Sequence, residues 1–207
     1  MIVEIPDVDL DVKDRDLAVS VLKKITIASQ VVGDKLVGHN TGVYFQKIPA
    51  DPITGYSAFP YKEAEWFGYY KVDIIANHVY DMIGSNDRLD ELLEEPIDWG
   101  WFLDSRFFGE EKNPNHRLTH ISKYLWLCQK YPPQSVEDLA ILIAVVRPGK
   151  SYLIGKSWNK IEENIWIKEG EGYEFKKSHA IAFALLVTVH AKIINNRLEE
   201  ENKDFEL

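Results

Sequence analysis

Residues 6–11 read Pro-Asp-Val-Asp-Leu-Asp, so carboxylates alternate with apolar side chains directly after a proline. Because side chains two residues apart in a strand share a face, the alternation predicts a β-strand over residues 2–12. The aspartates would project to one side of this strand, and Val8, Leu10 and Val12 to the other. Parallel carboxylates repel each other unless a cation lies between them. A D-x-D pair on an edge strand can also be merely solvated, so the stretch alone leaves both interpretations open.

A further aspartate lies in a strand expected over residues 69–76, where Asp73 follows Lys71 by two residues and shares its face. If this strand pairs with the first, the side chains of Asp9, Asp11, Asp73 and Lys71 converge. Hard oxygen ligands favour Mg²⁺ and similar ions such as Ca²⁺ or Mn²⁺. Two such ions roughly 3.5–4 Å apart support an in-line phosphoryl displacement. The sequence therefore predicts a magnesium or manganese site.

The remaining pattern predicts an α+β protein with a small mixed sheet and a mainly helical C-terminal half. A helix is expected from about Asp14 to Ala28, and a strand over residues 42–48. From about residue 77 the apolar spacing becomes helical. We expect an α/β half over residues 1–90 and a helical half over residues 91–207, either as two domains or within one compact domain.

One helix in the second half has both ends marked. Ser135 with Asp138 three residues later forms a capping box ahead of an apolar run. The helix should end at Arg147-Pro148-Gly149, because proline disfavours the helical conformation of the residue before it.

Composition excludes several classes of protein. The chain has 207 residues, a formal net charge of −9 and one cysteine, Cys128, so it is not a disulfide scaffold or a multi-cysteine zinc protein. Its longest apolar run, residues 139–146, is far shorter than the roughly 20 residues that cross a membrane. The N-terminus lacks a secretory leader pattern. We expect a cytoplasmic protein without a membrane partner. The acidic balance argues against broad coating of nucleic acid.

Five blocks of the sequence, in this order, resemble the bacterial DNA polymerase III alpha subunit, the C family of replicative polymerases. Together they span about residues 5–190, which favours a true relationship over chance. The blocks are residues 6–11, His39 with Gly42-Val43, Glu65 with Gly68, Lys71 and Asp73, residues 136–149 ending in Arg-Pro-Gly, and residues 172–185, which read GYEFKKSHAIAFAL.

The resemblance implies a nucleotidyltransferase-like palm followed by a fingers-like half, and a function as a DNA polymerase. It implies that Asp9, Asp11 and Asp73 bind catalytic Mg²⁺ or Mn²⁺, with Lys71 beside them. DNA and nucleotide are the implied partners, and the residues expected near them are Arg147, Lys177, Ser178 and His179.

Two further residues are interpreted from the sequence itself. His39 is expected to be a structural hydrogen-bonding residue and not a base. Lys156 lies beside Trp158 and Lys160, and this group is a candidate for DNA contact. The same lysine-rich stretch could equally be a plain solvated connection.

The chain also departs from the family, which keeps three functions open. Only 61 residues separate Asp11 from Asp73 and 25 separate Gly149 from Phe175, too few for the family's thumb and most of its fingers. No Gly-Ser motif precedes residue 6. The first hypothesis is a much shortened bacterial or phage polymerase core that needs a second chain or polymerase segment. The second is a catalytically inactive relative that binds nucleic acid or a replication partner. Nuclease activity at the same carboxylates ranks third.

Overall fold

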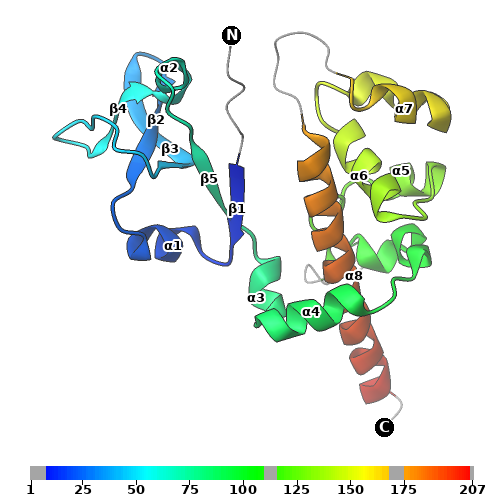
Figure 1. Cartoon of the computed structure of the whole chain (residues 1–207). Coiled ribbons are helices and arrows are strands. Elements are labelled where there is room, and N and C mark those ends of the chain that lie inside the picture. The colour runs from blue at the N-terminus through cyan, green and yellow to red at the C-terminus, as the bar shows by residue number, and fades with distance from the viewer. Residues whose placement is uncertain (1–7, 110–115, 168–174, 206–207) are drawn as a thin grey trace. The chain divides into compact units, whose positions relative to one another are not determined.

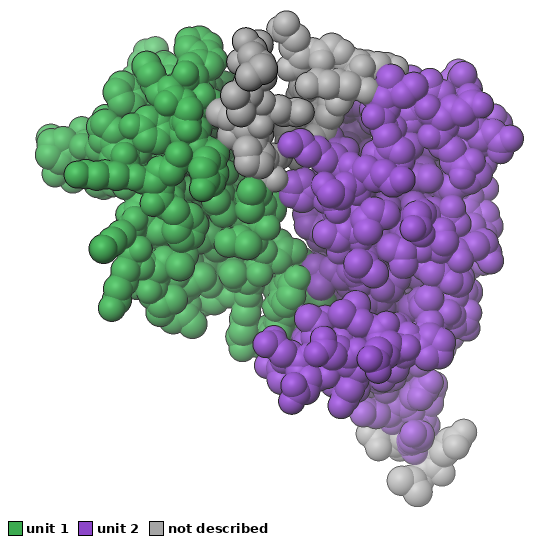
Figure 2. Space-filling model, viewed as in Figure 1, with its two compact units in different colours: residues 1–81 green, residues 82–207 purple. Residues whose placement is uncertain are grey.

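The computed structural model describes residues 8–109, 116–167 and 175–205, and it shows an α+β protein with a helical C-terminal half. The chain divides into two compact units, Met1–Asp81 and Met82–Leu207, coloured separately in Figure 2. We call them unit 1 and unit 2. The division falls before the boundary at residue 90 that the sequence suggested. Residues 2–7 of the expected first strand lie outside the described residues.

Unit 1 is built on a five-stranded mixed sheet with the strand order β1-β5-β3-β2-β4 (Figure 1). Strands β1 and β5 are parallel, as are β2 and β4, whereas β3 runs antiparallel to both β5 and β2. The edge position of β1 leaves one side of this strand open beyond the sheet. The strands are β1 (Val8–Val12), β2 (Thr26–Val32), β3 (Lys35–Tyr44), β4 (Tyr56–Pro60) and β5 (Val72–Ala76).

Helix α1 (Arg15–Val21) packs on one face of this sheet. It begins at Asp14, whose side chain accepts a hydrogen bond of 3.0 Å from the backbone N–H of Leu17. Apolar side chains of β1, β3 and β5 on this face pack against α1 and the residues after it. The strands contribute Val8, Val12, Val43, Val72 and Ile74, and the helical segment contributes Ala18, Val19, Leu22 and Ile25. The aspartates of β1 and β5 therefore face the opposite side.

The expected helix over residues 14–28 is wrong in its second half. The helix ends at Val21, and Lys24 adopts a positive φ of 63° that no helix can continue through. From Thr26 the chain is β2, which forms a hairpin with β3 through Gly33. The β-branched side chains of residues 25–27 and 31–32 favour the strand, and pairing with β3 outweighs the helical spacing.

Two more short helices complete unit 1. Helix α2 (Tyr61–Trp66) follows β4, and α3 (Val79–Ile83) leads out of the unit. A small core under α2 joins it to the sheet, and it consists of Ala28, Tyr44, Ile48 and Ala64 with Phe59 and Tyr69 packed against them.

Unit 2 is helical in its described residues. Its α-helices are α4 (Asn86–Glu94), α5 (Leu125–Lys130), α6 (Val136–Val145), α7 (Trp158–Asn164) and α8 (Lys177–Phe205). Short 3-10 helices cover Trp99–Leu103, Ser105–Phe107 and Ser151–Leu153. The capping box is confirmed, because the Ser135 hydroxyl accepts a hydrogen bond of 3.1 Å from the backbone N–H of Asp138.

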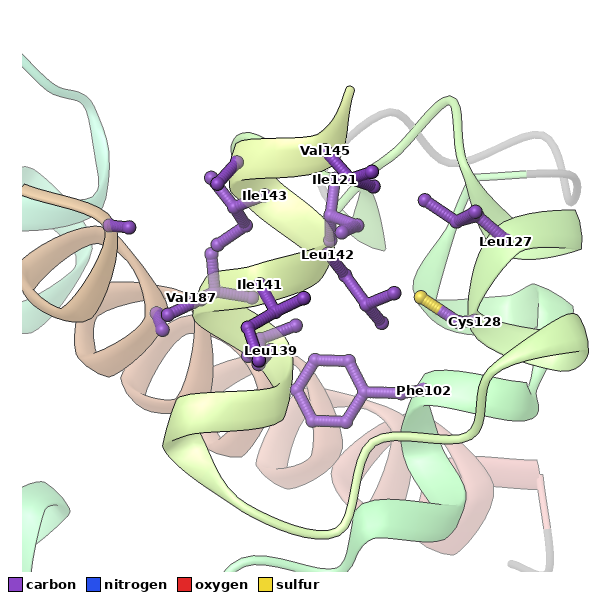
Figure 3. Packing of buried hydrophobic residues seen from close by; sticks show 14 of the residues in the cluster. Phe102, Ile121, Leu127, Cys128, Leu139, Ile141, Leu142, Ile143, Val145 and Val187 are labelled. Carbon is purple, nitrogen blue, oxygen red and sulfur yellow. The ribbon is translucent and has the colours of Figure 1, made fainter. Parts of the chain in front are cut away.

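The core of unit 2 surrounds α6, whose residues 139–145 are all buried (Figure 3). Leu142 and Phe102 lie on one side of this helix, and Val187 of α8 lies on another. Helix α8 is long and apolar enough to cross a membrane by length and composition, but most of its apolar stretch is buried inside unit 2. It is the core helix that packs beside α6.

Two buried lysines bind the carbonyl ends of helices in unit 2. Lys192 of α8 donates hydrogen bonds to the backbone oxygens of Leu92 and Glu95, where α4 ends. Lys150 donates in the same way to the backbone oxygens of Asn164 and Ile167 at the end of α7. The last carbonyls of a helix have no partner within it, so each ammonium satisfies groups that burial would otherwise leave unpaired.

Candidate metal centre

The central feature of unit 1 is that Asp9 of β1 lies directly opposite Asp73 of β5. Neighbouring strands are about 4.8 Å apart, and residues paired in register project to the same face of a sheet. Asp11 is two residues from Asp9 and shares this face, as Lys71 does with Asp73. The pairing that the sequence predicted therefore occurs, and it places the three carboxylates and the lysine on the same face of the sheet. We call Asp9, Asp11, Asp73 and Lys71 the acidic face.

Asp73 is held by two side-chain contacts. Its Oδ1 accepts a hydrogen bond of 2.6 Å from the hydroxyl of Thr41. Its Oδ2 pairs with the Lys71 ammonium, and both side chains are nearly buried, with 14% and 11% of their surface exposed. An ion pair that is shielded from water in this way is stronger than one at the surface. The carboxylate of Asp73 is thus fixed in orientation.

Gly42 makes room for Lys71. It lies opposite Asp73 on β3, and a Cβ atom at this position would come within 2.8 Å of Lys71 Cγ and 3.1 Å of Ala28 Cβ. The stem of Lys71 therefore lies across the backbone of Gly42. A side chain at residue 42 would therefore displace Lys71 from its place beside Asp73.

His39 holds the backbone around Thr41. Its Nδ1 accepts hydrogen bonds from the backbone N–H of Gly42 at 2.9 Å and of Thr41 at 3.3 Å. Its ring meets Tyr61 of α2 edge to face, with 5.2 Å between the centroids. Burial and the positive charge of Lys71 lower the pKa of His39. The neutral ring that results is the form that can accept at Nδ1, so His39 has the structural role that the sequence suggested.

Two tyrosines near the acidic face have raised pKa values. Burial raises the pKa of Tyr44 to about 12, and the charges of Glu65 and Asp73 add to the effect. Burial also raises the pKa of Tyr80, with a smaller contribution from Asp11. Both phenols stay protonated at neutral pH, so the charge of this region comes from the carboxylates and Lys71.

The acidic face carries three carboxylates against one ammonium, which leaves two negative charges. A divalent cation would neutralise them, and Mg²⁺ or Mn²⁺ has the required preference for oxygen ligands. Among the described residues, no group of three His, Cys, Asp or Glu side chains is arranged to hold a metal. Binding an ion would thus require side-chain rotation around Asp9 and Asp11, or a change in the contact between Lys71 and Asp73.

The residues expected to contact nucleotide or DNA lie in unit 2, around the start of α8. Lys177 and Ser178 are its first two residues and are exposed. The guanidinium of Arg147, which follows α6, lies 4.6 Å from the centre of the Phe175 ring. Phe175 in turn stacks on His179, with 6.3 Å between centroids. The structure thus brings Arg147 and His179 to the same aromatic ring.

Lys156 lies apart from this group in the sequence, in the turn before α7, and its side chain is exposed. The hydroxyl of Tyr131 donates a hydrogen bond of 2.7 Å to its backbone oxygen. The turn is therefore anchored to the end of α5.

No protein-family model, curated protein or solved structure matches this chain. A relationship to the C-family polymerases stays a prediction that rests on the five sequence blocks.

Thr41 and Tyr61 are the site residues that the sequence analysis missed. Thr41 is one residue out of phase with Gly42, so the alternation of a strand places it on the wrong face. It lies at an irregularity of the sheet, where residues 39–42 of β3 are opposite the single residue Ala28 of β2, so the regular alternation of a strand does not hold there. The sequence feature that could have indicated Thr41 as a site residue is its position between His39 and Gly42.

Proposed function

We propose that the acidic face binds Mg²⁺ or Mn²⁺ and that the protein carries out metal-dependent nucleotidyl transfer to DNA, as the C-family polymerases do. The observation that carries this proposal is the register of β1 and β5, which sets Asp9 opposite Asp73 with Asp11 on the same face. Three carboxylates on one face of adjacent strands are costly without a cation, because like charges held close together repel each other.

The contacts of Asp73 are compatible with this role. Thr41 and Lys71 each use one lone pair on a different carboxylate oxygen. An ionised carboxylate has about four acceptor positions, so Asp73 retains about two for a metal. Lys71 would supply a fixed positive charge next to the ion, where negative charge builds up on a transferring phosphate.

Unit 2 would bind the phosphates of nucleotide or DNA through Arg147, Lys177, Ser178 and His179. The guanidinium fork of Arg147 suits phosphate oxygens, and its contact with Phe175 limits how far it can move. Helix α8 has 29 residues, and backbone N–H groups at the start of such a helix favour anions. A second polymerase chain or segment would supply the triphosphate grip of the family.

A second candidate function is a catalytically inactive relative that binds nucleic acid or a replication partner. The observation that favours it is the close ion pair between Lys71 and Asp73. A lysine that neutralises Asp73 permanently would stabilise the acidic face without a metal, and the aspartates would then serve only the fold.

Primer extension with purified protein separates the two functions. The assay supplies a primed DNA template, four nucleotides and Mg²⁺ or Mn²⁺, with and without the proteins encoded by neighbouring genes. Extension that disappears in Asp9→Asn/Asp73→Asn supports the enzyme. The matched control is Asp34→Asn/Glu63→Gln, which removes the same charge at two exposed positions of unit 1. Metal-dependent shortening of the primer would indicate a nuclease, and DNA binding without either reaction would support the inactive relative.

A further inference from the structure

A basic stretch of the sequence surrounds the turn between α6 and α7. Residues 139–161 contain four lysines and arginines and no acidic residue, in a chain whose net charge is −9. Lys150 is buried against the end of α7, and Arg147 lies on Phe175. Lys156 and Lys160 are exposed. The charge of Lys156 is therefore available at the surface of unit 2, whereas Lys160 shares its charge with Glu163, 3.4 Å away.

Two aromatic rings lie in the same region. Tyr131, at the end of α5, and Trp158, the first residue of α7, have ring centroids 5.8 Å apart and planes inclined by 37°. Both side chains are half-buried and pack against the core of unit 2. The hydrogen bond from the Tyr131 hydroxyl to the backbone of Lys156 fixes the turn beside them. The two rings are therefore held next to each other and to the turn.

Lys130 lies beside the Tyr131 ring, and Lys156 and Lys160 are close to Trp158 in the sequence. The Nζ of Lys130 lies 5.4 Å from the centre of the Tyr131 ring. Gly155, with a φ of 95°, makes the turn that faces this lysine, since a Cβ there would lie 3.8 Å from Lys130 Nζ. Lys160 is 3.4 Å from Glu163, an exposed pair that is weak in water. We call Lys130, Tyr131, Lys156, Trp158 and Lys160 the aromatic-basic surface.

We propose that the aromatic-basic surface binds single-stranded nucleic acid. Unpaired bases stack on aromatic rings irrespective of sequence, and lysines beside the rings attract the phosphates. A duplex keeps its bases stacked on one another, so it would engage the lysines without the rings. An acidic peptide would likewise use only the charges. The site is independent of the acidic face, because all its residues belong to unit 2.

The test is fluorescence anisotropy with a labelled oligo-dT of about 20 nucleotides, at low salt and with EDTA to remove divalent metal. The full-length chain is used, in both the wild type and the Asp9→Asn/Asp73→Asn background. The charge variant is Lys130→Glu/Lys156→Glu, and its matched control is Lys123→Glu/Lys203→Glu, which changes the same charge at two other exposed lysines. The stacking variant is Trp158→Leu, with circular dichroism to check that the fold is kept.

We expect Trp158→Leu and the charge variant each to weaken binding roughly tenfold, in both backgrounds. An abasic strand of equal charge should also bind roughly tenfold more weakly than oligo-dT. Equal binding of the abasic strand, or an equal loss in the control variant, would overturn the proposal in favour of general attraction of polyanions. Displacement of oligo-dT by polyglutamate at equal charge would likewise overturn it. Because no metal is present, failure of the acidic face to bind a metal leaves this result unaffected.

Discussion

Gly42 and Lys71 are packed so closely that residue 42 has no space for a side chain. A Cβ atom there would overlap the lysine stem, whose Cγ would lie 2.8 Å away. The same lysine pairs with Asp73 of β5. Because Gly42 of β3 has no side chain, the Lys71 ammonium can reach the Asp73 carboxylate. The contact between Gly42 and the Lys71 stem therefore affects both the packing of β3 and the ion pair with Asp73.

We expect Gly42→Ala to lower the free energy of unfolding by about 1–3 kcal/mol, as overpacking of a buried site does. The added methyl group must displace Lys71 or Ala28. In a Lys71→Ala background the cost should fall, because the stem that meets the methyl group is gone. Urea unfolding of the four proteins measures both effects. Equal costs in the two backgrounds would show that Lys71 is not the neighbour that matters.

We expect Thr41→Val to remove the hydrogen bond that Asp73 Oδ1 accepts and so to destabilise the protein. The substitution keeps the shape of the side chain but removes the hydroxyl that donates at 2.6 Å. Hydrogen bonds to charged groups contribute about 1.5–3 kcal/mol, so unfolding free energy should fall by up to that amount. Thr41→Ser retains the donor and should recover most of the loss. A serine variant as unstable as the valine variant would show that the methyl group, and not the hydroxyl, is what matters.

The lowered pKa of His39 predicts a pH-dependent stability. The fold favours the neutral ring, whereas the unfolded chain binds a proton near pH 6.5. Stability should therefore decrease as the pH falls from 6.5 towards the lowered pKa of the folded protein. His39→Gln removes this contribution, so the difference in unfolding free energy between pH 7 and pH 5 should be smaller than in wild type. An unchanged difference would contradict the neutral, hydrogen-bonded role of His39.

We expect Lys192→Met to destabilise unit 2 by about 1–3 kcal/mol, because it leaves two backbone oxygens at the end of α4 without their donor. Burial lowers the pKa of Lys192, so part of this cost is offset by removing a group that is costly to keep charged. Lys203→Met, at an exposed position of α8, is the control and should change stability by less than about 0.5 kcal/mol. Thermal unfolding of both variants tests the difference. A Lys192 variant as stable as wild type would contradict the capping role.

The parts of the fold that depend on local rules were predictable from the sequence. The alternation at residues 6–11 gave the face of Asp9 and Asp11, and the capping box gave the start of α6 at Ser135. Both signals act within a few residues. Pairing Asp9 with Asp73 needed the additional assumption that two distant strands are neighbours.

The parts that depend on tertiary context were not predictable. The first three residues of β2 continue the expected helix, and its pairing with β3 and β4 outweighs that spacing. Strand β4 is short and follows a turn, and its partner β2 was itself assigned to a helix. The contact of Thr41 with Asp73 occurs beside an irregularity in the pairing of β3 with β2. These features arise from packing between segments, which a pattern along one segment does not contain.

Titration with Mn²⁺, followed by the electron paramagnetic resonance signal of the free ion, tests the central claim most directly. The wild-type chain should remove Mn²⁺ from solution, and Asp9→Asn/Asp73→Asn should bind it at least about tenfold more weakly, because two of three carboxylate ligands are lost. The Asp34→Asn/Glu63→Gln control should bind as wild type does. Negligible binding by wild type, or equal binding by wild type and the Asp9/Asp73 variant, would contradict the metal centre.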